Sequence, residues 1–136
     1  MRRRSSARRA ARLVVDASVV VSLLVSPDER ASGLLRPPLR APHLIDVEVV
    51  HALRRLARSR VIGPAAAAAA VAALPGLPLA RYPHVRLLDA IWALRDTVSA
   101  YDAAYVALAQ AFAEPLLTTD APLARAARRY VDVELA

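Results

Sequence analysis

The chain has 136 residues, of which 57% are hydrophobic and 23% charged, a balance that excludes intrinsic disorder over most of its length and suits a single domain. It contains no cysteine, which excludes disulfides and thiolate metal sites. The net charge of +7 is concentrated in residues 1–12, which hold six arginines and no acid, so the remaining body is nearly neutral.

Residues 1–12 form the first segment. We expect a disordered arm of the kind that contacts phosphates or, alternatively, a segment that is never made because translation begins later, for instance at Val14. The apolar run that follows, 13–25, is too short to span a bilayer and contains Asp16, which disfavours a secretory signal. The sequence therefore predicts a cytoplasmic protein with no membrane partner, whose one folded domain occupies 13–136.

Short apolar runs alternate with helical segments along the rest of the chain. The clearest helix is 44–60, where apolar residues recur at three- and four-residue steps and arginines take the other side. This alternation predicts an α/β fold in three layers, with a mainly parallel sheet flanked by helices. In chain order the predicted elements are a strand at 12–16, a helix at 17–24, a short helix ending near 35, an extended segment at 40–43, helices at 44–60 and 64–73, a strand at 79–82, helices at 84–95 and 99–112, a strand at 115–119, a helix at 121–129 and a strand at 131–135.

Capping residues set the expected helix ends. Gly63 is expected to end the long helix, and Pro64 to occupy the first position of the next one. Ser99 is expected to cap the helix that follows it, with Asp102 at the third helical position in an aspartate version of the capping box.

Four acids are placed differently from the others. Asp16 and Asp120 each follow an apolar strand, and ligand sites in parallel α/β sheets form beyond the carboxyl ends of the strands. Glu48 lies on the apolar side of the long helix, and Asp102 lies in the first turn of its own helix. Converging carboxylates without a basic partner bind hard cations such as Mg²⁺ or Mn²⁺. Together the four acids therefore favour a metal site.

Each of these acids also has a purely structural explanation. Asp16 and Asp120 can serve as helix N-caps, each worth about 1 kcal/mol. Asp102 can complement the dipole of its helix. Glu48 can pair with an arginine further along its helix, such as Arg55.

A family resemblance is carried by four segments in order: Val14-Val15-Asp16-Ala17-Ser18, APHLIDVEVVHALRRL at 41–56, SAYDAAYVALAQAF at 99–112 and LLTTDAPLARA at 116–126. Together they resemble the PIN-domain ribonucleases, and most of all the VapC-type toxins of bacterial toxin–antitoxin pairs. The resemblance covers about residues 13–130. The third segment is the most specific of the four.

The resemblance implies a PIN-like fold and a metal-dependent endoribonuclease. It places the family's acidic cluster on four residues that would hold Mg²⁺ or Mn²⁺, and two hydroxyl residues beside them that orient the carboxylates or the attacking water. Bound metal lowers the pKa of a water, which then attacks the phosphorus in line. The acids are Asp16, Glu48, Asp102 and Asp120, and the hydroxyl residues are Ser18 and Thr119.

The resemblance also implies partners and shows two departures. The partners are an RNA substrate, a cognate antitoxin and a second copy of the chain, with a heterotetramer or larger assembly once the antitoxin joins. His51 and Thr97 stand where the family often has asparagine, which bears on substrate preference and leaves the acids untouched. Arginines are expected to cradle the RNA, and the candidates are Arg12, Arg54, Arg58 and Arg95.

The remaining side chains with chemical potential are given structural roles. Asp46 is expected to project from another face of the long helix into solvent. Tyr101, Tyr105 and Trp92 are expected to be core or dimer contacts, because a chain with so few aromatic residues is poorly suited to binding single strands mainly by stacking.

Two other functions stay open at this point. One is a PIN-like module that binds RNA or protein without cleaving it, against which the four intact acids argue. The other is an acid-rich metal phosphatase or flap-type DNA nuclease, which would be expected to have more acids and a longer chain. Metal-dependent cleavage of RNA, but not of duplex DNA, discriminates among the three.

Overall fold

The computed structural model describes residues 12–26 and 38–136, so the predicted arginine arm and the short helix ending near residue 35 lie outside it. Five strands form one parallel sheet in the order β3-β2-β1-β4-β5, which confirms the predicted α/β class. Each strand falls on one of the predicted extended segments. The strands are β1 (Leu13–Val15), β2 (Leu39–Pro42), β3 (Leu79–Tyr82), β4 (Leu116–Thr118) and β5 (Val133–Leu135).

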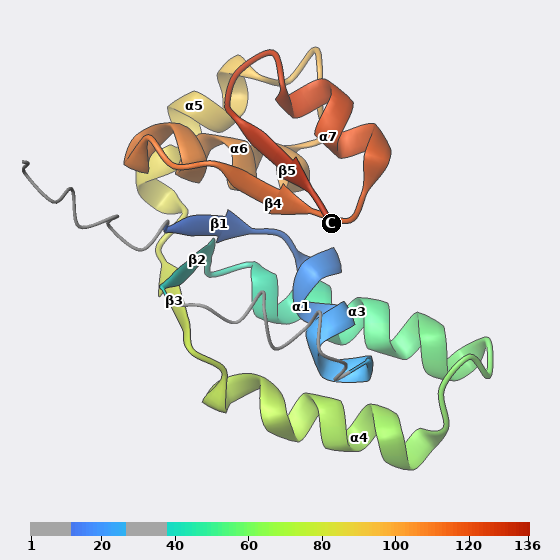
Figure 1. Ribbon diagram of the computed structural model, residues 1–136. Coiled ribbons are helices and arrows are strands. Elements are labelled where there is room, and N and C mark those ends of the chain that lie inside the picture. Colours follow the sequence, from blue (N-terminus) through green and yellow to red (C-terminus); the bar gives the residue numbers. More distant parts are fainter. Residues whose placement is uncertain (1–11, 27–37) are drawn as a thin grey trace, which may run out of the picture.

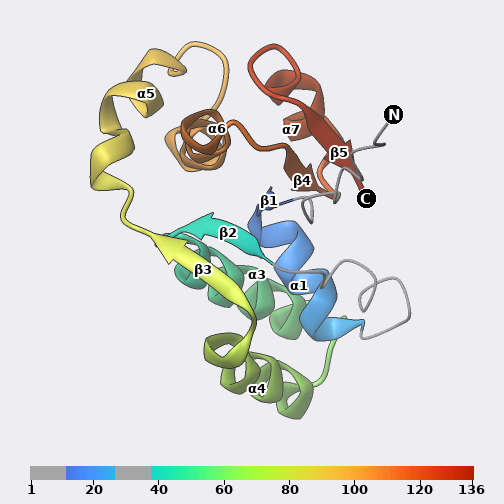
Figure 2. The same cartoon turned by 60° about the vertical axis from the view of Figure 1, so that its left-hand side comes forward.

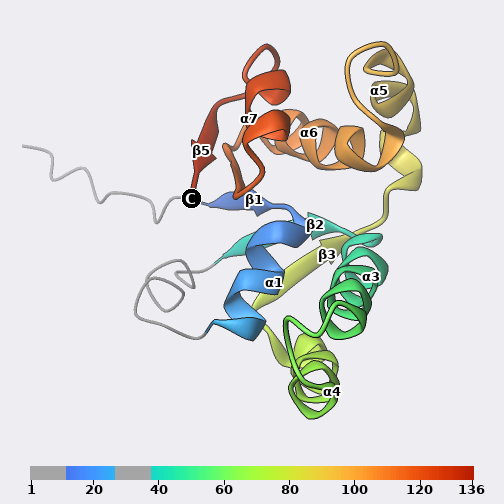
Figure 3. The ribbon, with the colours of Figure 1, turned by 90° about the vertical axis from the view of Figure 1, so that its right-hand side faces the viewer.

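Helices cover both faces of this sheet and complete the three predicted layers. One face carries α1, α3 and α4, and the other carries α5, α6 and α7 (Figures 1 and 3). Two 3₁₀ turns, η1 (Leu74–Gly76) and η2 (Val85–Leu87), precede β3 and α5. The helices are α1 (Ala17–Val25), α3 (Ile45–Arg58), α4 (Pro64–Ala73), α5 (Leu88–Ala93), α6 (Ala100–Phe112) and α7 (Ala121–Ala127).

The strand order creates one switch point, between β1 and β4. From β1 the chain moves through α1 to β2 on one side, whereas from β4 it moves through α7 to β5 on the other side. The two helices therefore leave the sheet on opposite faces, and a crevice opens beyond the carboxyl ends of β1 and β4. The edge of the sheet on the β2 side is β3, which lies beside β2 with α3 beneath (Figure 2).

The centre of the core lies between α6 and the sheet. Seven consecutive residues of α6, Ala103–Ala109, are buried, because this helix packs against β1, β2 and β4 and is flanked by α5. Several of these residues are alanines, whose small side chains let the helix approach the strands closely. Tyr105 is the largest fully buried side chain, so the prediction of a core position for it is confirmed.

Two predicted helix boundaries are wrong. The long helix ends at Ser59, and its final turn closes through Arg60 in the left-handed conformation at φ 57°, whereas Gly63 is the N-cap of α4. The single helix predicted at 84–95 is divided into η2 and the short α5, which packs against α6 through partly buried residues.

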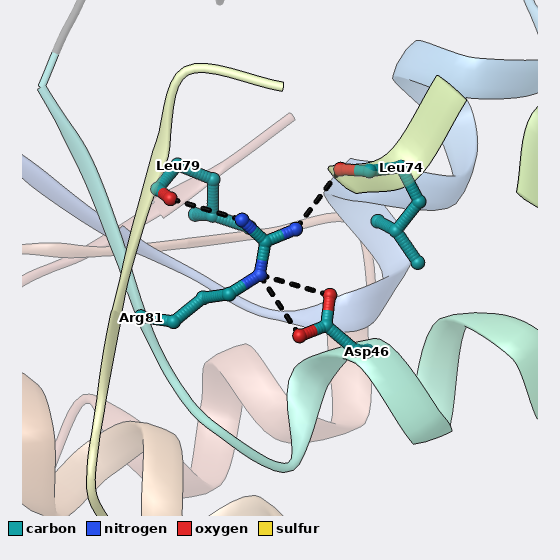
Figure 4. Close-up of polar contacts among 4 residues, drawn as sticks. All are labelled: Asp46, Leu74, Leu79 and Arg81. Carbon is teal, nitrogen blue, oxygen red and sulfur yellow. Dashed lines mark hydrogen bonds and ion pairs between the residues drawn. The ribbon is translucent and has the colours of Figure 1, made fainter. Parts of the chain in front are cut away.

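Asp46 is an ion-pair partner and is not the free, solvated acid that the sequence predicted. The Arg81 guanidinium of β3 donates from Nε to both Asp46 carboxylate oxygens, at 2.9 and 2.8 Å (Figure 4). Its other two nitrogens donate to the backbone carbonyls of Leu79 and Leu74, at 3.2 and 2.9 Å. A single side chain thus ties the edge strand to α3 and to the turn before β3.

A second cation holds α6 against β2. Arg40 of β2 is buried, donates to Glu114 at 3.1 Å and to the Tyr82 hydroxyl, and lies 4.1 Å from the centre of the Phe112 ring. A buried guanidinium is tolerated here because a carboxylate, a hydroxyl and an aromatic face together replace its hydration.

The Arg81 contacts predict a measurable loss of stability when the guanidinium is removed. Arg81→Met keeps most of the aliphatic stem and should lower the free energy of unfolding by about 1–2 kcal/mol, because the Leu74 carbonyl and the Asp46 carboxylate lose their donors. Urea unfolding measures this change. Arg86→Met, at an exposed position of η2, is the matched control, and an equal loss in both variants would contradict the assignment.

Candidate active site

The site is built around Asp16, the residue that follows β1 at the switch point. Its carboxylate is 6% exposed and accepts from the backbone N–H of Val19 at 3.4 Å, so it caps α1 as the sequence predicted. A buried carboxylate beside the core is costly unless its oxygens are hydrogen-bonded. Two hydroxyl groups supply those bonds.

Ser18 and Thr118 hold the two oxygens of this carboxylate. The Ser18 hydroxyl donates to Oδ1 at 2.5 Å, and the Thr118 hydroxyl donates to Oδ2 at 2.7 Å. Thr118 is the last residue of β4 and is fully buried, so its bond to Asp16 joins the two strands that flank the switch point. The carboxylate therefore has one fixed orientation.

Asp120 follows β4 in the same way that Asp16 follows β1. Its Oδ1 accepts from the backbone N–H of Leu123 at 3.1 Å, which confirms it as the N-cap of α7. Its own N–H donates to the Thr118 hydroxyl at 3.0 Å, so one threonine orients both acids. Asp120 is exposed, and capping uses only one of its carboxylate oxygens.

Thr119 does not make the contact that its position suggested. In the part of the chain that the structure describes, its backbone N–H donates to the Ser18 hydroxyl at 3.0 Å, while its hydroxyl has no hydrogen bond to a carboxylate. The threonine that contacts the acids is the preceding one, Thr118. A role for the Thr119 hydroxyl in orienting a water stays a prediction.

Glu48 and Asp102 come from two helices that begin at the same edge of the sheet. Glu48 lies in the first turn of α3, and Asp102 in the first turn of α6, where Ser99 caps the helix by accepting from the Asp102 N–H at 3.2 Å. The predicted ion pair between Glu48 and Arg55 is not among the contacts of the described residues. Instead, the buried Oε1 of Glu48 has no hydrogen-bond partner.

Tyr105, one helical turn after Asp102, lies beside Glu48. Its hydroxyl is buried and, like Oε1 of Glu48, is left without a hydrogen bond of good geometry. The charges of Glu48, Asp16 and Asp102 act on this hydroxyl and, after burial, raise its pKa. A core tyrosine thus brings a neutral donor to the cluster of acids.

The pKa shifts show that the four carboxylates share one electrostatic environment. Burial, followed by the charges of Asp102 and Asp16, raises the pKa of Glu48 to about 7. Burial, then Asp120 and Asp16, raises the pKa of Asp102. Burial also raises the pKa of Asp16, against the effect of its hydrogen bonds and with a further contribution from Asp120. No arginine contributes to any of these shifts, so the cluster lacks a counter-cation within the described chain.

The donor chemistry suits a hard divalent cation, although the side chains are not closed around one. Three carboxylates with raised pKa values, those of Asp16, Glu48 and Asp102, the neighbouring charge of Asp120 and one unpartnered oxygen are what Mg²⁺ or Mn²⁺ would neutralise. Within 12–26 and 38–136, no three Asp, Glu or His side chains are close enough to ligate one ion as they stand. Binding a metal therefore requires side-chain rotation at this site, and the helix positions already allow the carboxylates to approach.

Two cavities flank the acids. One, of about 400 Å³, lies between α1 and α3 and is bordered by Ser18 and Thr119. The other, of about 500 Å³, lies between the starts of α3 and α6 and is lined by Glu48, His51 and two exposed side chains, Val47 and Tyr101. One cavity therefore adjoins the acids through Ser18, which contacts Asp16, and the other through Glu48 itself.

Sequence analysis missed two residues of this site. Thr118 differs from Thr119 only by one position, and the pleat of β4 decides which of them faces Asp16. Tyr105 was predicted to be a core or dimer contact, although its spacing of three from Asp102 places both on one side of α6. That spacing is the signal that could have found it.

Comparison with known proteins identifies the family. Residues 13–129 match the family described as the PIN domain. The chain is similar to Ribonuclease VapC1 of Mycobacterium tuberculosis, with 47% identity over 127 residues that cover 90% of this chain and 96% of that protein. The chain therefore belongs to the PIN-domain family. Within it the chain is a VapC-type ribonuclease toxin, which confirms the endoribonuclease activity predicted from the sequence.

Solved structures agree with this fold at low sequence identity. PAE2754 from Pyrobaculum aerophilum superposes with a TM-score of 0.65 at 24% identity, covering 90% of this chain and 84% of its own. VapC20 of Mycobacterium tuberculosis, described as a sarcin-ricin loop cleaving toxin, gives 0.63 at 20% identity, covering 84% and 94%. At these identities the likeness concerns the fold.

None of the helices in 12–26 and 38–136 combines the length and the apolar character needed to cross a membrane.

The raised pKa of Glu48 predicts a pH-dependent stability. Above a pH of about 7, the ionised Glu48 carboxylate destabilises the folded, metal-free protein. Between pH 4.5, the ordinary pKa of a glutamate, and about pH 7, the folded protein binds a proton that the unfolded chain has lost. Stability in chelator should therefore rise as the pH falls through this window. At about pH 8 the free energy of unfolding of Glu48→Gln should exceed that of the wild type by about 1–2 kcal/mol, because the variant carries no charge at this position. Solvent screening of the half-buried carboxylate keeps the difference this small, and near pH 4.5 the two proteins should be equally stable.

Urea unfolding in chelator at several pH values measures this difference. His51→Gln, one turn along the same helix at an exposed position, is the control and should follow the wild type. A Glu48→Gln variant that is less stable than the wild type at pH 8 would contradict the electrostatic description.

Proposed function

We propose that the four carboxylates at the switch point, Asp16, Glu48, Asp102 and Asp120, hold Mg²⁺ or Mn²⁺ and cleave RNA phosphodiester bonds. The observation that carries the proposal is their shared electrostatic environment without a basic partner, in which the pKa of Glu48 reaches about 7. A protein gains no stability from such an arrangement of like charges. A bound cation accounts for it.

The residues divide into two that are fixed and two that can move. Asp16 is oriented by two hydroxyl groups, and Asp120 by its capping bond and by Thr118, so they would form the preorganised side of the metal site. Glu48 has an unpartnered oxygen, and the Asp102 carboxylate has a hydrogen bond with Ser99 in its own helix turn, so these two would close the site from the other side. Bound metal would supply charge neutralisation and lower the pKa of a water.

The protein's own part in the reaction is positioning. Glu48, whose pKa is about 7 without a metal, would lose its proton when a cation binds and would then serve as a ligand. The Tyr105 hydroxyl can donate to a Glu48 oxygen and fix the direction of its free lone pair. Ser18 and Thr118 would keep the Asp16 carboxylate in one orientation while RNA is bound.

We further propose partners of the kinds that the relatives suggest. These are an RNA substrate, a cognate antitoxin that places a basic side chain among the acids, and a second copy of the chain, in a cytoplasmic setting. Support for the second copy comes from large apolar side chains left exposed on α3, α5 and α6. Because Trp92 and Tyr101 are each 68% exposed, they are not core residues, and together with Val47 they suit an interface.

The nuclease proposal predicts that a single neutralised acid abolishes cleavage. Asp16→Asn should lower the rate of cleavage of single-stranded RNA in Mn²⁺ by about 100-fold or more, because several kcal/mol of charge stabilisation is lost. Asp132→Asn removes an exposed acid just before β5, at the end of the sheet opposite to the carboxyl ends of the strands, and this variant should cleave at the wild-type rate. Equal rates in both variants would reject the site, and a wild type that cleaves no RNA in Mg²⁺ or Mn²⁺ would reject the activity.

Thermal unfolding separates a metal cluster from a set of helix caps. Asp102→Asn should raise the melting temperature by a few degrees in chelator, because it removes one of several repelling charges. It should also reduce the further rise that millimolar Mn²⁺ gives the wild type, since a ligand stabilises in proportion to its affinity for the folded state. If Asp102 only complements its helix dipole, the variant loses about 0.3–1 kcal/mol and Mn²⁺ changes nothing.

A further inference from the structure

We infer that the cavity between α1 and α3 binds an RNA backbone phosphate next to the scissile one, with Arg55 as its cationic contact. The inference takes its ligand from the proposed function, since the acids identify the bond that is cut. It adds a binding site, the arginine that contacts the phosphate, and the side of the acids on which the neighbouring nucleotide lies. Neither the acids nor the family comparison assigns these.

The lining of this cavity has the composition of a phosphate site. Its volume is about 400 Å³, and its lining residues include one arginine and four hydroxyl-bearing residues but no acid. The Ser18 hydroxyl already donates to Asp16, so the other three hydroxyl groups are the candidates to donate to a phosphate. Such groups donate hydrogen bonds to anionic oxygens, and a guanidinium adds charge and a bidentate geometry. The hydroxyl residues are Ser18, Ser22, Ser59 and Thr119, and the apolar floor, which can receive a ribose, is Val21, Ala52 and Leu56.

The cavity adjoins two of the acids through its wall. Ser18 lies in its wall and also donates to the Asp16 carboxylate at 2.5 Å, and Thr119, in the same wall, precedes Asp120. A nucleotide held here is therefore a direct neighbour of one whose phosphate faces the carboxylates. The second cavity, with Glu48 and Tyr101 in its walls, lies on the other side of the acids and has no arginine in its lining.

Charge explains why the substrate needs this contact. A phosphodiester that approaches four carboxylates is repelled until a cation neutralises them, so affinity must come from groups beside the acids. Arg55 is exposed and makes no ion pair with another described residue. Arg54, which the sequence suggested as an RNA contact, is its neighbour on α3 and is also exposed, but it does not line the cavity, so we assign the contact to Arg55 instead. The two arginines therefore carry the same charge on the same helix, and they differ in that only Arg55 lines the cavity.

Binding of a short fluorescent single-stranded RNA of mixed sequence tests the inference. An Asp16→Asn background prevents cleavage, and fluorescence anisotropy is measured over a range of salt concentrations. Arg55→Ala should weaken binding about tenfold and make the slope of log affinity against log salt shallower by about 0.7, the value for one single-strand phosphate contact. Arg55→Lys keeps the charge, so it should retain the slope.

Two controls make the result specific to the cavity. Arg54→Ala should change affinity less than twofold, because its charge lies outside the cavity. Replacing the RNA by one with neutral methylphosphonate linkages should abolish the difference between Arg55→Ala and its parent. Equal losses from Arg54→Ala and Arg55→Ala, or a loss that persists on the neutral RNA, would overturn the assignment.

Failure of this inference is distinguishable from failure of the proposed function. If the wild type cleaves RNA in Mn²⁺ while Arg55→Ala leaves affinity and salt slope unchanged, the cavity assignment is overturned and the nuclease stands. If Arg55→Ala weakens RNA binding as expected but the wild type cleaves nothing, the cavity assignment is supported and the nuclease mechanism is rejected.

Discussion

The hydrogen bond from the Thr118 hydroxyl to the Asp16 carboxylate is the contact on which the rest of the site depends. It joins the ends of β1 and β4, the two strands from which the chain departs in opposite directions, and so fixes the geometry of the crevice between them. The same hydroxyl accepts from the Asp120 N–H, so the two acids that follow these strands are oriented through one atom. Fold and chemistry meet at this threonine.

The arrangement has a cost that only a ligand offsets. Asp16 and Asp120 each stabilise a helix as an N-cap, and this local benefit holds whether or not a metal binds. Glu48 does not stabilise the fold in this way, because its Oε1 is buried without a hydrogen-bond partner and its pKa is raised to about 7. Protein sites that break the rules of stability in this way are commonly the functional ones. Two acids of the cluster therefore stabilise helices as N-caps, whereas Glu48 destabilises the metal-free fold.

The fold and the placing of Asp16 and Asp120 after strands could be predicted from the sequence because each leaves a local signal, whereas the family resemblance assigned Glu48 and Asp102 to the same cluster. Apolar runs mark the strands, capping residues mark the starts of α6 and α7, and an acid directly after a strand marks the active edge of a parallel sheet. Contacts that depend on which way a side chain points left no such signal. The pairing of Asp46 with Arg81, the burial of Arg40 and the choice of Thr118 over Thr119 each follow from sheet register and helix rotation. Those are properties of the assembled molecule.

The Asp16–Thr118 bond spans 102 positions of the chain, nearly the whole described domain. Contacts of such long sequence separation form only after most of the polypeptide is available, so the site cannot assemble on a partial chain. Until residue 120 has been added, the nascent chain lacks Asp120 and a complete set of carboxylates. The site is therefore among the last parts of the molecule that can form during synthesis.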